Sequence, residues 1–96
     1  MKHAGPATIA GLTPLLAEIR KLGGLSEKKP GVFYWKSRAF LHFHEHGDEI
    51  YADVRLKGND FQRLPCSTRR DQASLVAAIS RWHEAQTRHG RAACGV

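Results

Sequence analysis

Cysteine, proline and long apolar runs are scarce in this chain. Two of its 96 residues are cysteines and four are prolines. A disulfide framework needs more cysteines in an oxidising compartment, so Cys66 and Cys94 are expected to be free thiols. No apolar run approaches the ~18 residues that cross a bilayer, and residues 1–5 lead into no signal-peptide segment. These absences argue against a membrane partner and predict a cytoplasmic protein.

Sequence motifs of catalysis are also missing. The chain has no Gly-x-Ser-x-Gly, no Gly-rich phosphate loop and no His-Glu-x-x-His. Cys66 stands near Arg69 and Arg70, whose charges would lower the pKa of its thiol. A structural role at a strand–helix junction is the commoner use of such a residue. The sequence therefore favours a small non-enzymatic binding or interaction module.

The composition indicates one globular domain. The hydrophobic fraction is 42%, and a chain of this length normally forms a single domain. We expect that domain over residues 1–96, with an ordered core at about 8–90 and loose ends. Lys and Arg number 15 against 9 Asp and Glu, which gives a formal charge of +6. Such an excess is typical either of a polyanion-binding surface or of an ordinary solvated surface.

Two segments have the pattern of amphipathic helices. The first covers residues 14–22, with Thr13-Pro14 as a favoured start and Gly23-Gly24 as a favoured stop. The second covers residues 69–88, with Thr68 and Asp71 placed as a capping box and His89-Gly90 as the expected end. Both repeat apolar residues at i, i+1, i+4 and i+7, namely Leu15, Leu16, Ile19 and Leu22, then Leu75, Val76, Ile79 and Trp82.

Between these helices the residues alternate as in β-strands. Residues 32–35 are β-branched and aromatic, and residues 38–56 alternate around His46-Gly47, which suits a two-residue hairpin loop. A fourth strand is expected at residues 61–64, whereas residues 25–31 look like a polar link. The expected inward pairs are Phe43–Ile50, Leu41–Ala52 and Ala39–Val54, and the expected outward pairs are His44–Glu49, His42–Tyr51 and Phe40–Asp53.

These elements predict a two-layer α+β domain. Its order would be α-β-β-β-β-α, an antiparallel meander sheet with both helices packed on one face. The other face would stay open to solvent and carry the polar residues of the hairpin.

A pattern known from small bacterial proteins occurs within residues 33–48. The matching residues are Phe33, Arg38, Phe40, His44, Glu45, Gly47 and Asp48. Through them the segment resembles the MmcQ/YjbR-like family. The resemblance implies a frataxin-like (CyaY-like) α/β arrangement, no established activity and DNA as a suggested partner. Residues 40–45 and 51–54 are also similar to bacterial proteins named after a luciferase domain, a label that implies no luciferase chemistry.

His42, His44 and His46 form a His-x-His-x-His run. Residues two apart in a strand point to the same side, so His42 and His44 present two imidazoles together. With Glu49 expected opposite His44, these residues form a candidate zinc site in which Asp53 would orient an imidazole. The alternative is a polar sheet face without a cofactor, on which the histidines pack beside Phe and Tyr.

The same face is a candidate surface for single-stranded nucleic acid, because it combines aromatic rings with cations. The residues of this candidate surface are Arg38, Phe40, His42, His44, Tyr51 and Arg55. Phe33 and Trp35 would join it if Lys36-Ser37 is a two-residue loop, and would face the helices if the turn has three residues. A further alternative is a homodimer contact through Phe40 and Tyr51 or through an unpaired edge strand.

Overall fold

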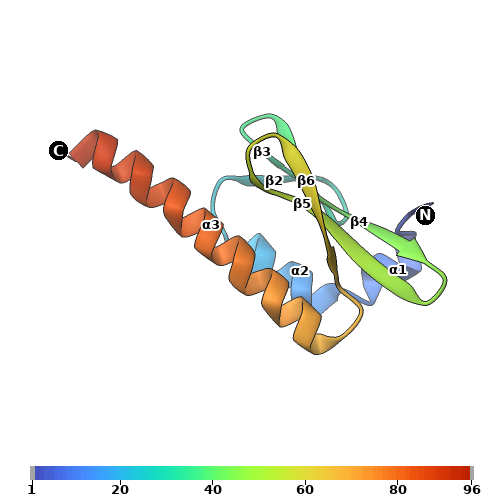
Figure 1. Ribbon diagram of the computed structural model, residues 1–96. Coiled ribbons are helices and arrows are strands. Elements are labelled where there is room, and N and C mark those ends of the chain that lie inside the picture. Colours follow the sequence, from blue (N-terminus) through green and yellow to red (C-terminus); the bar gives the residue numbers. More distant parts are fainter. Residues whose placement is uncertain (1, 96) are drawn as a thin grey trace.

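The computed structural model describes the backbone of residues 2–95 and the side chains of residues 2–87. It is an α+β domain in which helices cover one face of a six-stranded antiparallel sheet (Figure 1). Strands β2 to β6 follow one another across the sheet in chain order, and β1 pairs with β4. The predicted α+β meander is confirmed. The elements are β1 (Lys2–His3), α1 (Pro6–Ala10), α2 (Thr13–Arg20), β2 (Leu25–Lys29), β3 (Val32–Trp35), β4 (Arg38–His46), β5 (Glu49–Lys57), β6 (Asp60–Pro65) and α3 (Arg69–Gly95).

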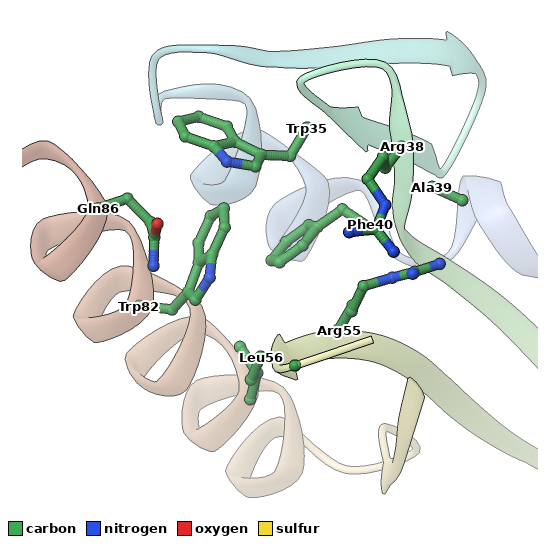
Figure 2. A pocket seen from close by; sticks show the side chains of 9 residues that line it. Trp35, Arg38, Ala39, Phe40, Arg55, Leu56, Trp82 and Gln86 are labelled. Atoms are coloured by element: carbon green, nitrogen blue, oxygen red, sulfur yellow. The ribbon is translucent and has the colours of Figure 1, made fainter. Parts of the chain in front are cut away.

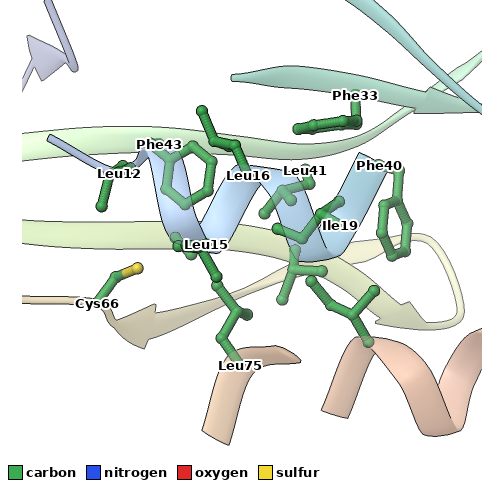
Figure 3. Packing of buried hydrophobic residues seen from close by; sticks show 13 residues of the cluster. Leu12, Leu15, Leu16, Ile19, Phe33, Phe40, Leu41, Phe43, Cys66 and Leu75 are labelled. Atoms are coloured by element: carbon green, nitrogen blue, oxygen red, sulfur yellow. The ribbon is translucent and has the colours of Figure 1, made fainter. Parts of the chain in front are cut away.

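Helices α2 and α3 form where the apolar periodicity places them. The capping box at the start of α3 is present: the Asp71 N–H donates to Thr68 Oγ1 over 3.0 Å, and the Thr68 N–H donates to Asp71 Oδ2 over 3.4 Å. Both helices pack their apolar stripes on the sheet (Figure 3). The helix side chains in this core are Leu15, Leu16, Ile19, Leu75 and Ile79.

Helix α3 continues beyond its expected end. Its backbone is helical through Gly95, so His89-Gly90 does not terminate it. Arg91-Ala92-Ala93 are strong helix formers and outweigh one glycine. The C-terminal part of α3 extends past the sheet (Figure 1). The Cys94 thiol lies outside the described side chains. Among the described residues, no helix combines the length and the apolar content needed to cross a membrane.

The first residues are ordered, although the sequence suggests a loose end up to about Ala7. Lys2 and His3 form β1, which pairs with Glu45 and His44 of β4. The Ala4 N–H donates to the Phe43 carbonyl over 3.0 Å. The Glu45 carboxylate then holds the following turn by accepting hydrogen bonds from the Gly5 N–H and the Thr8 hydroxyl. The N-terminal segment is therefore part of the sheet.

The segment expected to be a polar link contains strand β2. Its residues pair with β3, from Leu25 opposite Trp35 to Lys29 opposite Val32. Glu27 on this strand accepts hydrogen bonds from the Arg20 guanidinium and, over 2.9 Å, from the Gly31 N–H. An edge strand with mostly exposed side chains needs little apolar content, and this explains why the pattern missed it.

The β4–β5 hairpin has a different register from the expected one. The turn is Gly47-Asp48, with His46 opposite Glu49, so each pair is displaced by two residues along one strand. His44 lies opposite Tyr51 and His42 opposite Asp53, rather than opposite Glu49 and Tyr51. A displacement of two residues leaves the side chains from Leu41 onward on their predicted faces. Leu41 and Val54 consequently still meet in the core.

A β-bulge at Phe40 corrects the prediction for the start of β4. Phe33 pairs with Leu41 but Tyr34 pairs with Ala39, which leaves Phe40 as the extra residue. Phe40 is therefore buried, with 2% of its surface exposed, and stacks on Trp82 at a centroid distance of 4.2 Å. The open face does not contain Phe40, contrary to the prediction.

The same bulge decides which face of the sheet the residues flanking the β3–β4 turn occupy. Lys36-Ser37 is a two-residue loop with positive φ at both positions, yet Phe33 and Trp35 face the helices. Two residues in the loop would have placed these rings on the open face in an unbulged strand, and the extra residue reverses the alternation. Arg38, directly opposite Trp35, shares its face and leaves the predicted surface as well.

The core lies between the sheet and the two longer helices (Figure 3). Cys66, just after β6, is fully buried in it, and burial together with the Asp71 charge raises the pKa of its thiol to about 12. The prediction that Arg69 and Arg70 lower this pKa is wrong. The structural role at the strand–helix junction is consistent with this burial.

Candidate metal centre

Three histidines meet on the open face of the sheet. His42 and His44 point the same way because they are two residues apart in β4. His3 joins them from β1, where it lies directly opposite His44. The ring centroids are 4.6 Å apart for His3 and His44, 4.9 Å for His42 and His44, and 5.7 Å for His3 and His42. We call these three residues the histidine cluster.

The ring nitrogens of the cluster are somewhat farther apart than the nitrogen ligands of one zinc ion. One ring nitrogen from each residue can be chosen so that all three lie within 4.8 Å of one another. Zinc–nitrogen bonds of about 2.0–2.1 Å in tetrahedral geometry place ligand nitrogens about 3.4 Å apart. Small side-chain rotations would therefore bring the rings onto one ion. His3 is exposed, so it has the most freedom to move.

Several ring nitrogens of the cluster are buried and have no hydrogen-bond partner. They are His42 Nδ1, His44 Nδ1 and His44 Nε2. His44 Nε2 lies 3.1 Å from Asp53 Oδ2, an ion-pair distance, but off the direction of a hydrogen bond. Buried polar atoms are nearly always paired, so these unpaired nitrogens need an explanation. A bound cation would satisfy one nitrogen of each ring, and the other His44 nitrogen would remain for Asp53.

Asp53 supplies a negative charge beneath the cluster. It lies opposite His42, is 7% exposed and accepts two hydrogen bonds from Arg63, from Nε over 2.8 Å and from Nη2 over 2.9 Å. The hydrogen bonds from Arg63 keep the pKa of the Asp53 carboxyl below its ordinary value. Asp53 is thus ionised at neutral pH, and its carboxylate lies close enough to His44 Nε2 to accept a hydrogen bond after a small rotation of the ring.

His42 is held in the protonation state that binds metals. Burial, followed by the neighbouring His44, lowers the pKa of the His42 imidazole below its ordinary value near 6.5. Its ring is therefore mostly neutral at pH 7, and a neutral imidazole has a free lone pair for a metal ion. Asp53 opposes this shift only in part.

The surroundings leave one side of the cluster accessible. His3 and His42 border a depression of about 540 Å³ whose walls include Lys28, Lys29 and Tyr34. On another side, the Phe61 ring meets the His42 ring at 4.9 Å and lies 4.4 Å from the Arg55 guanidinium carbon. An ion held by three imidazoles would thus have a fourth position facing water or a small ligand.

Two residues of the predicted sites are placed elsewhere. Glu49, the expected third ligand, lies opposite His46 and accepts a hydrogen bond from the Tyr51 hydroxyl, so it is not part of the histidine cluster. His46 is exposed at the end of β4. Tyr51 lies opposite His44 on the open face, as its alternation predicts. Arg55 stacks on Phe61 at the margin of this face.

His3 is the member of the site that sequence reasoning missed. A two-residue strand has no periodicity, so nothing in residues 2–3 marks them as part of a sheet. The available signal was chemical: His3 is a further histidine in a chain with six. Only the pairing of β1 with β4 brings it to His44.

Comparisons with known proteins identify no relative of this chain. No family model, no curated protein and no solved structure matches it. The resemblance to the MmcQ/YjbR-like family accordingly stays a prediction, and the candidate function rests on the geometry of the histidine cluster.

Proposed function

We propose that this chain is a metal-binding protein that holds one divalent transition-metal ion, with zinc as the first candidate, through His3, His42 and His44. The observation that carries the proposal is the convergence of three imidazoles, two of which, those of His42 and His44, have buried nitrogens without a hydrogen-bond partner. Neutral imidazoles suit zinc, copper and nickel rather than calcium or magnesium, which prefer oxygen ligands. Asp53 and Arg63 would act as the outer support of the site.

The open face of the sheet supports metal binding better than it supports the stacking of nucleic-acid bases. Phe40 and Trp35 face the helices, so the open face keeps fewer rings than expected. Tyr51 and Phe61 remain on or beside it. Nucleic-acid binding through this face, a homodimer contact and a cytoplasmic location all stay predictions.

The test uses untagged protein that has never contacted a metal-affinity resin. Native mass spectrometry and calorimetric titration with zinc should show one ion per chain. The double variant His42→Ala with His44→Ala should lose this binding, and His3→Ala should weaken it, because the number of imidazole ligands falls from three. His46→Ala is the matched control, since this exposed histidine in the same strand lies outside the cluster.

The outcomes separate clearly. Equal zinc binding by the wild type and the double variant would show that the ion binds elsewhere. A wild type that binds no zinc, nickel or copper at micromolar concentrations would overturn the proposal. Circular dichroism of each variant establishes that a loss of binding is not a loss of folding.

A further inference from the structure

A second concave site lies at the end of the sheet that holds the β3–β4 and β5–β6 turns. It is a cavity of about 250 Å³ between this end of the sheet and helix α3 (Figure 2). Its lining residues come from four separate elements and include Trp35, Phe40, Arg55 and Trp82. None of these side chains contributes an imidazole to the histidine cluster, so the two sites are chemically distinct.

One wall of the cavity is aromatic. The Trp82 indole stacks on Phe40 at 4.2 Å with an interplanar angle of 26°, and Trp35 meets Trp82 edge-on at 5.0 Å. Both indoles are half-buried, whereas Phe40 is fully buried behind them. The packing fixes the orientation of the two tryptophans and leaves part of each one facing the cavity (Figure 2).

The opposite side of the cavity is cationic. Arg38 and Arg55 both extend to Asn59, where Arg38 Nη2 donates to Oδ1 over 2.9 Å and Arg55 Nη1 donates to the carbonyl oxygen over 3.1 Å. These bonds hold two guanidinium groups close together despite their like charge (Figure 2). Arg55 Nε is buried and has no hydrogen-bond partner.

Within the described part of the chain, no negative charge balances these guanidinium groups. No acidic residue lines the cavity, and among the side chains of residues 2–87 no carboxylate forms a salt bridge with Arg38 or Arg55. By contrast, Arg20 and Arg63 each have a carboxylate partner. Paired guanidinium groups without a carboxylate form the arrangement that recognises phosphate or carboxylate groups.

We propose that this cavity binds a small anion that carries one aromatic ring, such as an aryl monophosphate or an aromatic carboxylate. The anionic group lies against Arg38 and Arg55, and the ring lies against Trp35 and Trp82. The cavity volume is below the ~300–1,000 Å³ of common ligand sites, so it favours a ligand of one ring. This inference does not depend on the metal site.

The structure offers a direct readout, because the chain has two tryptophans and both line this cavity. Intrinsic fluorescence is followed during titration with phenyl phosphate, and separately with inorganic phosphate and with phenol. Phenyl phosphate should change the emission and bind at least about tenfold more tightly than either fragment, since it gains both the charged hydrogen bonds and the ring contact.

Variants then test the two arginines. Arg38→Gln should weaken phenyl phosphate binding by about tenfold, as expected from loss of a charge-assisted hydrogen bond, and Arg55→Gln should do the same. Arg70→Gln is the control, because it removes the same charge from an exposed position at the start of α3. If Arg55→Gln disturbs folding through its contact with Phe61, the exposed Arg38 decides the question.

Three results would overturn the inference. The first is an equal loss of binding in Arg70→Gln and Arg38→Gln, which would mean that net charge alone attracts the anion. The second is phenyl phosphate binding no tighter than inorganic phosphate. The third is tight binding of an oligothymidylate without binding of phenyl phosphate, which would favour a nucleic-acid surface over a small-molecule site.

Discussion

Asp53 places a buried negative charge next to the histidines of the open face. Its carboxylate accepts two hydrogen bonds from Arg63, which neutralises its charge, and one of its oxygens also lies 3.1 Å from His44 Nε2. Burying a carboxylate without a cation would destabilise the fold, and the ion pair with Arg63 offsets this desolvation cost. The result is a fixed negative group next to the imidazoles.

Replacing Asp53 tests this supporting role. In Asp53→Asn we expect zinc affinity to fall by about tenfold or more while the histidine ligands remain, because residues that orient metal-binding imidazoles typically contribute this much. Calorimetric titration measures the change. Glu49→Gln is the matched control and should leave the affinity unchanged, because Glu49 is bonded to Tyr51 outside the cluster. A larger loss in Glu49→Gln would restore Glu49 as the ligand.

His42 makes the metal-free protein sensitive to acid. Its folded pKa lies below the unfolded value near 6.5, so the unfolded chain takes up this proton first as the pH falls. The free energy of unfolding should therefore decrease as the pH is lowered from about 7 and through 6.5, until the folded pKa is passed. The lowered pKa of Asp53 acts in a separate window, since its contribution is lost only below about pH 4.

Urea titrations of chelator-treated protein between pH 7 and 5 measure this dependence. His42→Gln should reduce the slope, because glutamine does not titrate. His46→Gln is the matched control, since it makes the same substitution at an exposed position of the same strand. An unaltered slope in His42→Gln would assign the acid sensitivity to other groups.

At the scale of elements, the bulge in β4 decides what each sheet face carries. One extra residue puts both Phe40 and Leu41 into the core and turns Trp35 and Arg38 toward α3. The histidines beyond the bulge keep the alternation that the hairpin predicts. Along β4, the residues that line the cavity beside α3 thus come before the bulge or form it, and the histidines of the cluster come after it.

The bulge can be tested through stability. Phe40→Ala should lower the free energy of unfolding by about 3–5 kcal/mol, because it removes a buried ring that stacks on Trp82. Tyr51→Ala should cost about 1 kcal/mol or less, since this residue stands on the open face. Chemical denaturation followed by circular dichroism compares the two. Similar small losses in both variants would contradict the placement of Phe40 in the core.

At the scale of the whole molecule, one core joins both helices to the sheet. It continues from Leu12 beside α2 to Ile79 on α3, and Cys66 is enclosed within it. Exposing the Cys66 thiol therefore requires these layers to separate. Its pKa of about 12 adds a chemical barrier, because the thiolate is the reactive form.

Thiol labelling should consequently report on opening of the molecule. In a Cys94→Ser variant at pH 8, Ellman's reagent should react with Cys66 at a rate set by unfolding, and denaturant should accelerate the reaction to that of a free thiol. Zinc should slow the labelling, because a ligand that binds the folded state stabilises it. Fast labelling of the native protein would show that Cys66 is accessible without unfolding.

The amino-acid sequence by itself determined the features that depend on local periodicity. The apolar stripes and the Thr68–Asp71 cap specified α2 and α3, and the alternation of the hairpin specified which side His42 and His44 take. The tertiary structure alone decided the bulge at Phe40 and the pairing of β1 with β4. The bulge is accompanied by packing on Trp82, 42 residues away in the chain, and the β1 pairing joins residues more than 40 positions apart. Such long-range contacts leave no local pattern, and for this reason His3 and the cavity beside α3 emerged only from the folded molecule.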